Sequence, residues 1–140
     1  MHSRWLALTI LFIWPICYAE DFAVITFNNE LQPLRANQVK MLYRGRLNHL
    51  EGIAIKLADL PDNSPIRQQF YQALLNKTPS QMNMIWARQS FSGQSSAPYE
   101  LENDSVSDVM DWLINNPNGV AYLPASLLPA DVNVLYTLNN

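Results

Sequence analysis

The pattern of hydrophobic and polar residues along the chain predicts alternating strands and helices. Short apolar runs rich in β-branched and aromatic residues predict strands, and apolar residues spaced three or four apart predict helices. The order is strand, short helix, strand, two helices, loop, helix, strand and strand. These elements are expected at 22–27, 35–44, 52–61, 65–75, 79–91, 92–104, 106–116, 119–124 and 132–138. Such an alternation predicts an α/β sandwich in which helices cover a mixed sheet.

Capping residues mark the beginnings of three of these helices. Ser64-Pro65 and Thr78-Pro79 each place a hydroxyl side chain before a proline, which is favoured at the first helical position. Ser105 precedes the predicted helix at 106–116, with Asp108 three residues on as an approximate capping box. The two central helices are therefore expected to follow each other with a short break between them.

The N-terminal segment MHSRWLALTILFIWPICYA has the organisation of a secretory signal peptide. Arg4 lies near its start, an apolar stretch runs from Trp5 to Cys17, and the small residue Ala19 precedes an acidic pair. The apolar stretch is shorter than the about 20 residues that a membrane span needs. We expect cleavage after Ala19, export to the periplasm, and a single domain over residues 20–140. The alternative is an uncleaved N-terminal anchor.

Composition narrows the classes of function. The chain has 140 residues, of which 49% are hydrophobic and 15% charged, as in compact soluble domains. A net charge of −3 without a basic run argues against nucleic acid as a partner, because nucleic-acid binding requires a positive surface. The single cysteine, Cys17, lies in the predicted signal peptide, so no disulfide, cysteine nucleophile or cysteine metal site is expected after cleavage.

Enzymatic and metal chemistry find little support in the sequence. His49 is the one histidine beyond the predicted signal peptide, and no carboxylates accompany it at metal-ligand spacing. No nucleophile with a nearby base can be named, so we expect neither an enzyme nor a metal or cofactor. Asp59 and Asp62 stand three apart, but turns favour aspartate for local hydrogen bonds, and we interpret both as turn residues.

The start of the helix at Ser64 is a candidate anion site. Unpaired backbone N–H groups and the positive end of the helix dipole gather there. Asp62, Asn63 and Ser64 surround this position, and Arg67 falls in the first turn. The alternative is that Ser64 simply caps the helix and Arg67 is a solvated charge.

A second candidate follows in the segment WARQSFSGQSS. Hydrogen-bond donors gather beside Gly93, where the backbone can approach a ligand closely. They are supplied by Arg88, Ser90, Ser92 and Ser95. The alternative is a flexible connector without a ligand.

Three motifs, in this order, resemble the phosphate-transporter substrate-binding family of type 2 periplasmic binding proteins, most closely its short members with an export signal. The segment 42–47 is similar to the start of the family motif IF-x-G-K-I-x-x-W, and PNGVAYL at 117–123 is similar to PGAIGYV. Between them, DLPDNSPIRQQF at 59–70 stands where full-length members have R-S-D-G-S-G-T before a helix. The resemblance implies a single-lobe domain of the periplasmic-binding-protein type.

The resemblance also implies a ligand and a set of contacts. Asp62 and Ser64 match the aspartate and serine of the family motif, whereas Leu60 stands in the place of its ligand-binding arginine. Arg67 or Arg88 is then the expected replacement. The implied ligand is phosphate or a similar oxyanion, bound weakly, and the implied partner is a membrane transporter or sensor. The alternative is an accessory or protein-interaction domain that keeps the lobe fold without binding a ligand.

Overall fold

The computed structural model describes residues 9–11 and 20–139. Apart from residues 9–11, the predicted signal peptide lies outside the described residues, so cleavage after Ala19 stays a prediction. In the part of the chain that the structure describes, no helix is both long enough and apolar enough to cross a membrane.

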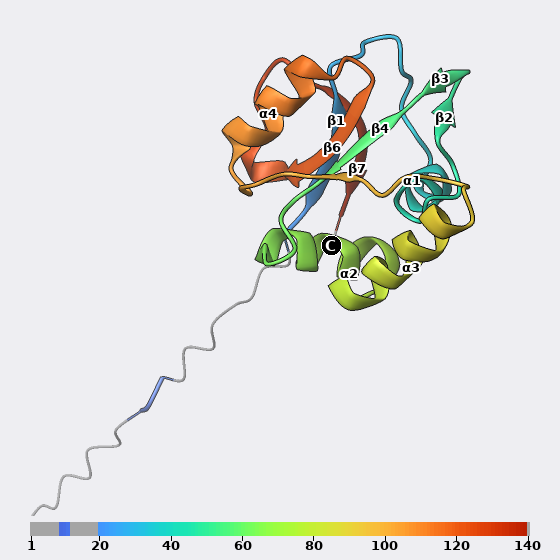
Figure 1. Ribbon diagram of the computed structural model, residues 1–140. Helices are drawn as coiled ribbons and strands as arrows, with labels where there is room; N and C mark the ends of the chain where they lie inside the picture. Colours follow the sequence, from blue (N-terminus) through green and yellow to red (C-terminus); the bar gives the residue numbers. More distant parts are fainter. Residues whose placement is uncertain (1–8, 12–19, 140) are drawn as a thin grey trace, which may run out of the picture.

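Residues 20–139 combine four α-helices with a mixed sheet, as predicted (Figure 1). The sheet has five strands, and one of them, at 99–100, lies in the segment 92–104 that was predicted to be a loop. The helices are α1 (Ala36–Tyr43), α2 (Pro65–Leu75), α3 (Pro79–Phe91) and α4 (Val106–Asn115), with a short 3₁₀ turn η1 (Ala125–Leu127). The strands are β1 (Phe22–Thr26), β2 (His49–Leu50), β3 (Ile53–Ala54), β4 (Lys56–Asp59), β5 (Tyr99–Glu100), β6 (Gly119–Pro124) and β7 (Asn133–Leu138). The main sheet has the order β5-β4-β6-β1-β7.

The sheet joins parallel and antiparallel pairs. β4 runs parallel to β5 and β6, and β1 runs antiparallel to both β6 and β7. The register places Phe22 opposite Pro124 on one side and opposite Leu138 on the other. Helices α1, α2 and α3 lie on one face of this sheet and α4 on the other (Figure 1). The helices thus cover the sheet on both faces.

The predicted strand at 52–61 is divided into two strands. The amide of Ile55 donates to the carbonyl of Asn48 (2.9 Å), whereas the amide of Lys56 donates to the carbonyl of Asn118 (3.2 Å). The chain therefore leaves the β2–β3 hairpin and enters the main sheet between these two residues. Glu51 and Gly52, with φ of 51° and 80°, form the hairpin turn. Positive φ at both central residues is typical of two-residue hairpin loops.

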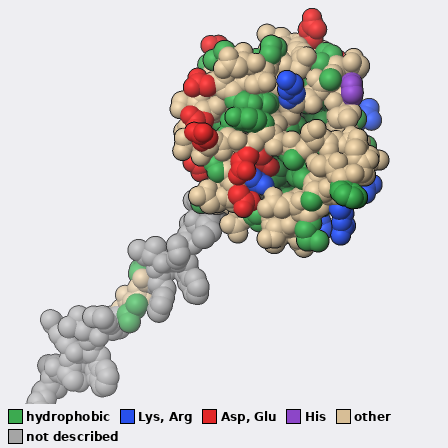
Figure 2. All heavy atoms as spheres, viewed as in Figure 1, with side chains coloured by type: hydrophobic (Ala, Val, Ile, Leu, Met, Phe, Trp, Pro, Cys, Tyr) green, Lys and Arg blue, Asp and Glu red, His purple; other side chains and the backbone are tan. Residues whose placement is uncertain are grey.

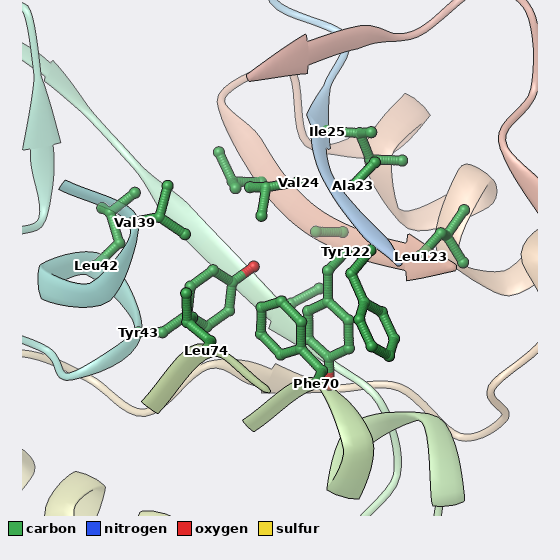
Figure 3. Close-up of a cluster of buried hydrophobic side chains, with 14 of the residues drawn as sticks. Ala23, Val24, Ile25, Val39, Leu42, Tyr43, Phe70, Leu74, Tyr122 and Leu123 are labelled. Atoms are coloured by element: carbon green, nitrogen blue, oxygen red, sulfur yellow. The ribbon is translucent and has the colours of Figure 1, made fainter. Parts of the chain in front are cut away.

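An aromatic cluster fills the core between the sheet and helices α1 and α2. Figure 3 shows Val24 and Tyr122 directed toward Tyr43 and Phe70, and Leu123 on the opposite side of the sheet. The rings of Phe70 and Tyr122 stack with centroids 3.7 Å apart, and Tyr43 meets Phe70 edge to face at 5.0 Å. Because both faces of β1 and β6 are buried, these strands read as continuous apolar runs instead of alternating ones.

The end of α1 packs closely against α3. Gly45 follows the helix with a φ of 72°, a conformation that favours glycine, and confirms the predicted stop. A Cβ atom at this position would lie 2.7 Å from Cζ3 of Trp86. Gly45 is therefore required both by its backbone conformation and by the indole ring beside it.

Candidate functional site

The candidate site lies where β4 ends and α2 begins. The predicted cap is confirmed, because the Ser64 hydroxyl accepts a hydrogen bond from the Arg67 amide (3.4 Å). The same hydroxyl donates to Oδ2 of Asp104 (2.9 Å). A carboxylate from the segment before α4 thus already lies at the positive end of the α2 dipole, where negative charge is favoured.

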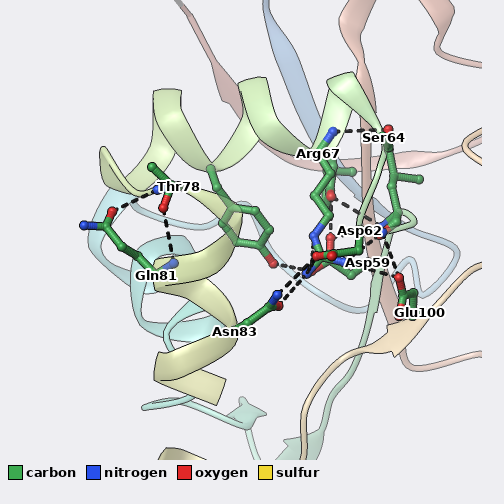
Figure 4. A network of polar contacts seen from close by, with 11 residues as sticks. Asp59, Asp62, Ser64, Arg67, Thr78, Gln81, Asn83 and Glu100 are labelled. Carbon is green, nitrogen blue, oxygen red and sulfur yellow. Dashed lines mark hydrogen bonds and ion pairs between the residues drawn. The ribbon is translucent and has the colours of Figure 1, made fainter. Parts of the chain in front are cut away.

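Arg67 extends from the first turn of α2 into the protein and is 6% exposed. Nη1 donates to the carbonyl of Leu60 (2.9 Å), and Nη2 donates to Oδ1 of Asn83 on α3 (3.1 Å). Figure 4 shows the guanidinium between the end of β4, α3 and the segment that carries Glu100. The interpretation of Arg67 as a solvated charge is therefore wrong.

Three carboxylates surround this guanidinium. The ion-pair distances are 3.7 Å from Nε to Oδ2 of Asp59, 3.6 Å from Nη2 to Oδ1 of Asp62, and 3.7 Å from Nη1 to Oε1 of Glu100. Asp59 is buried, whereas the side chains of Asp62 and Glu100 are 62% and 55% exposed and are screened by water. Figure 2 shows acidic side chains gathered around a basic one on the face that segment 92–104 crosses in Figure 1.

Asp59 connects the site to the aromatic core. Its carboxylate accepts hydrogen bonds from the hydroxyls of Tyr71 and Tyr122 and from the amide of Leu60. Burial raises the pKa of Asp59, while the ion pair with Arg67 and these hydrogen bonds lower it. The pKa values of Tyr71 and Tyr122 are raised as well, by burial first and by the Asp59 charge second. Asp59 therefore helps to fix the Arg67 guanidinium in place, and the hydroxyls of Tyr71 and Tyr122 fix the Asp59 carboxylate.

A cavity of about 270 Å³ opens beside Arg67. Four of its lining side chains carry hydrogen-bond donors, namely those of Arg67, Asn83, Trp86 and Ser90. Asp59, Ala87, Ala97, Pro98 and Glu100 complete the lining. Among the described residues, three side-chain groups are buried without a hydrogen-bond partner, namely Nε of Arg67, Nε1 of Trp86 and the hydroxyl of Tyr43. Arg67 and Trp86 line this cavity, and Tyr43 does not. Buried donors are nearly always paired, so two unpaired donors on side chains that line one cavity make this cavity a candidate place for an acceptor.

The structure brings part of the predicted set together. Asp62, Ser64 and Arg67 lie within one network, with Asn63 exposed between the first two. Arg88, Ser92 and Gly93 are exposed at the end of α3 and do not belong to the lining of the Arg67 cavity. Ser90 lines the Arg67 cavity and also a separate hollow of about 420 Å³. Gly93 lines that hollow as well.

Sequence reasoning did not name Asn83 or Glu100 as site residues; it counted Ser90 among the donors of the second candidate segment and placed Trp86 in the core. Asn83, Trp86 and Ser90 are spaced three and four apart on α3, which puts them on one face of that helix. A polar residue on either side of a buried tryptophan was the signal available. Glu100 belongs to β5, a two-residue strand that no periodic pattern marks in the sequence.

Metal binding has no geometric basis in residues 9–11 and 20–139. In this part of the chain, no group of three or more histidine, cysteine, aspartate or glutamate side chains could hold a metal ion. The three acidic residues around Arg67 pair with that guanidinium instead.

Comparison with known proteins identifies the fold. No model of a known protein family matches the sequence, and no curated protein matches it. Two solved structures are similar to this chain in fold. One is a putative phosphate ABC transporter substrate-binding protein from Clostridium perfringens with bound phosphate, at a TM-score of 0.62 and 17% identity. The other is an ABC-type phosphate transport receptor from Vibrio cholerae, at a TM-score of 0.61 and 13% identity.

The likeness covers 83% of this chain in both cases, but 44% and 45% of the two other chains. The chain therefore spans less than half the length of these proteins. The predicted resemblance to phosphate-transporter substrate-binding proteins and the predicted single-lobe α/β fold are confirmed. At these identities the comparison establishes the fold, and the phosphate belongs to the Clostridium perfringens protein.

Proposed function

We propose that this chain is an exported substrate-binding domain that holds phosphate or a similar oxyanion weakly in the Arg67 cavity, in the service of ABC-type phosphate uptake or sensing. The observation that carries the proposal is the pair of buried, unpartnered N–H groups on Arg67 and Trp86, whose side chains line one cavity. A buried donor without an acceptor costs about 1–3 kcal/mol. An oxyanion with several acceptor oxygens removes that cost.

The guanidinium is suited to this role. Arginine presents donors in a planar fork that matches the geometry of carboxylate and phosphate oxygens. In the free protein the Arg67 fork faces Asp59 and Glu100 at 3.7 Å, which are ion-pair contacts and not hydrogen bonds. The Nε donor therefore keeps its capacity for a further acceptor. Arg67 is thus our choice for the residue that replaces the family arginine. Arg88, Ser92 and Gly93, which do not line this cavity, stay a predicted second anion site.

The carboxylates set the strength of binding. Asp59 and Glu100 line the same cavity, so an incoming anion meets negative charge as well as donors. Their presence favours an oxyanion that still carries a proton, because a hydroxyl group can donate to a carboxylate. We expect weak binding that is reduced further by salt, since the exposed part of the site is screened.

Calorimetric titration and thermal shift with sodium phosphate test the proposal. Trp86→Phe keeps an aromatic ring and removes the Nε1 donor, and Arg67→Lys keeps the charge and removes Nε and the fork. Loss of a hydrogen bond to a charged oxygen costs about 1.5–3 kcal/mol, so each variant should bind phosphate at least about tenfold more weakly. Arg46→Ala, at an exposed arginine outside the lining of the cavity, is the matched control.

The thermal shift of each protein is measured against its own midpoint without ligand. A site at about 100 times its dissociation constant stabilises the protein by about 2.7 kcal/mol. If phosphate shifts the wild type, Trp86→Phe and Arg67→Lys alike, the ligand binds elsewhere. If tens of millimolar phosphate shifts none of them, the accessory or protein-interaction role replaces this proposal.

A further inference from the structure

A second and larger cavity adjoins the Arg67 cavity. Its volume is about 720 Å³, against about 270 Å³ for the smaller one. The two cavities share Trp86, Ala97, Pro98 and Glu100, so these residues form their common wall. Small organic ligands typically occupy pockets of about 300–1,000 Å³. The larger cavity thus has room for an organic group, whereas the smaller one suits a group of the size of inorganic phosphate.

The walls of the larger cavity are chemically different from those of the smaller one. Apolar side chains from three regions line it, including Ile55, Leu57 and Trp112. The rings of Tyr99 and Trp112 are stacked beside it, with centroids 6.2 Å apart and an interplanar angle of 17°. Tyr99 is 59% exposed and therefore presents aromatic surface to the solvent side of the cavity. Such a wall suits a planar or apolar group.

Trp86 links the two cavities. Its side chain lines both of them, the residue is 5% exposed, and its Nε1 donor has no partner among the described residues. A buried indole N–H normally finds an acceptor. A ligand at the junction of the polar and apolar cavities would supply that acceptor.

We infer that the ligand is an organic phosphoryl compound, that is, a phosphate monoester or phosphonate with a small planar or apolar substituent. This inference rests on the proposed function, since the phosphoryl oxygens occupy the Arg67 cavity. The substituent lies in the larger cavity against Leu57 and the Tyr99–Trp112 stack. The oxygen nearest the substituent accepts from Nε1 of Trp86. Inorganic phosphate fills the smaller cavity alone and binds more weakly.

The test compares phenyl phosphate with inorganic phosphate by calorimetric titration of the same protein. Burial of the phenyl ring should make phenyl phosphate at least about tenfold tighter, and the two ligands should compete for one site. Ala54 is exposed and lines the larger cavity but not the smaller one, so Ala54→Trp should fill the space of the ring. Tyr99→Ala removes part of the aromatic wall at an exposed position and serves as the second variant.

Ala54→Trp and Tyr99→Ala should each lower the ratio of the affinity for phenyl phosphate to that for inorganic phosphate toward one. Ala130→Trp adds the same ring at an exposed alanine that lines neither cavity, and it should keep the wild-type ratio. Equal binding of the two ligands by the wild type would overturn the inference and leave the proposed function standing. A ratio that survives Ala54→Trp and Tyr99→Ala would also overturn it. If neither ligand binds, the proposed function fails first and the inference fails with it.

Discussion

Replacement of Arg67 by methionine tests how the candidate site is held together. Methionine keeps much of the apolar stem and removes the guanidinium. Asp59 then loses its one close cation within the described network while it stays buried at 3% exposure. Removal of one partner from a buried ion pair costs about 3–5 kcal/mol, because the remaining charge is uncompensated.

The lower end of that range applies here. Asp59 keeps hydrogen bonds from Tyr71, Tyr122 and the Leu60 amide, which stabilise the remaining charge. The pairs of Arg67 with Asp62 and Glu100 add little, since exposed pairs contribute about 0–1 kcal/mol. We therefore expect a loss of about 3 kcal/mol at pH 7. For a domain of this size that corresponds to about 10–15 °C in the melting temperature.

Urea denaturation at pH 7 and at pH 4 measures the loss. At the lower pH the carboxyl of Asp59, whose pKa is raised by burial, is more often protonated, so Arg67→Met should cost less there. Glu100→Gln is the matched control, because it removes a half-exposed partner and should cost less than about 1 kcal/mol. The reasoning is refuted if both variants lose the same free energy, or if the cost of Arg67→Met does not change with pH.

Gly45→Ala should lower the unfolding free energy by about 1–3 kcal/mol more than Gly93→Ala. Both glycines have a similar φ (72° and 74°), but the new Cβ would meet Trp86 only at position 45. Equal losses of unfolding free energy in urea would contradict this packing. Ser64→Ala should cost about 1 kcal/mol through loss of the helix cap, and an unchanged denaturation midpoint would argue against it. Burial raises the pKa of Asp59, so the folded state binds more protons than the unfolded state. The unfolding free energy of the wild type relative to Asp59→Asn should therefore fall as pH rises above about 4. A rise would show that the ion pair and hydrogen bonds, which lower this pKa, outweigh burial.

Local signals explain why most of the fold could be predicted. The caps at Ser64, Thr78 and Ser105 act within one helical turn, and all three accept the expected backbone hydrogen bond. The buried strands and amphipathic helices follow from short-range periodicity. The division of 52–61 into β3 and β4 could not be predicted in this way. It depends on a change of pairing partner from Asn48 to Asn118, which lie far apart along the chain.

The candidate site shows the same limit. Position alone marked Arg67 as a candidate, because it follows the helix cap. Its burial depends on Asp59, Asn83 and Glu100, which come from β4, α3 and β5 and are brought together only by the tertiary fold. Arg88 carries the same charge but stays exposed, and nothing in the local sequence separates the two arginines.

The place of β1 in the sheet has a consequence for the order of folding. β1 is the first strand of the sheet along the chain, yet both of its neighbours, β6 and β7, are the last two. A ribosome or a membrane channel that releases the chain from its N-terminus would expose β1 long before either partner emerges. Pairing over such sequence distances also slows folding. The domain is therefore expected to reach its native sheet only after β6 and β7 have been released.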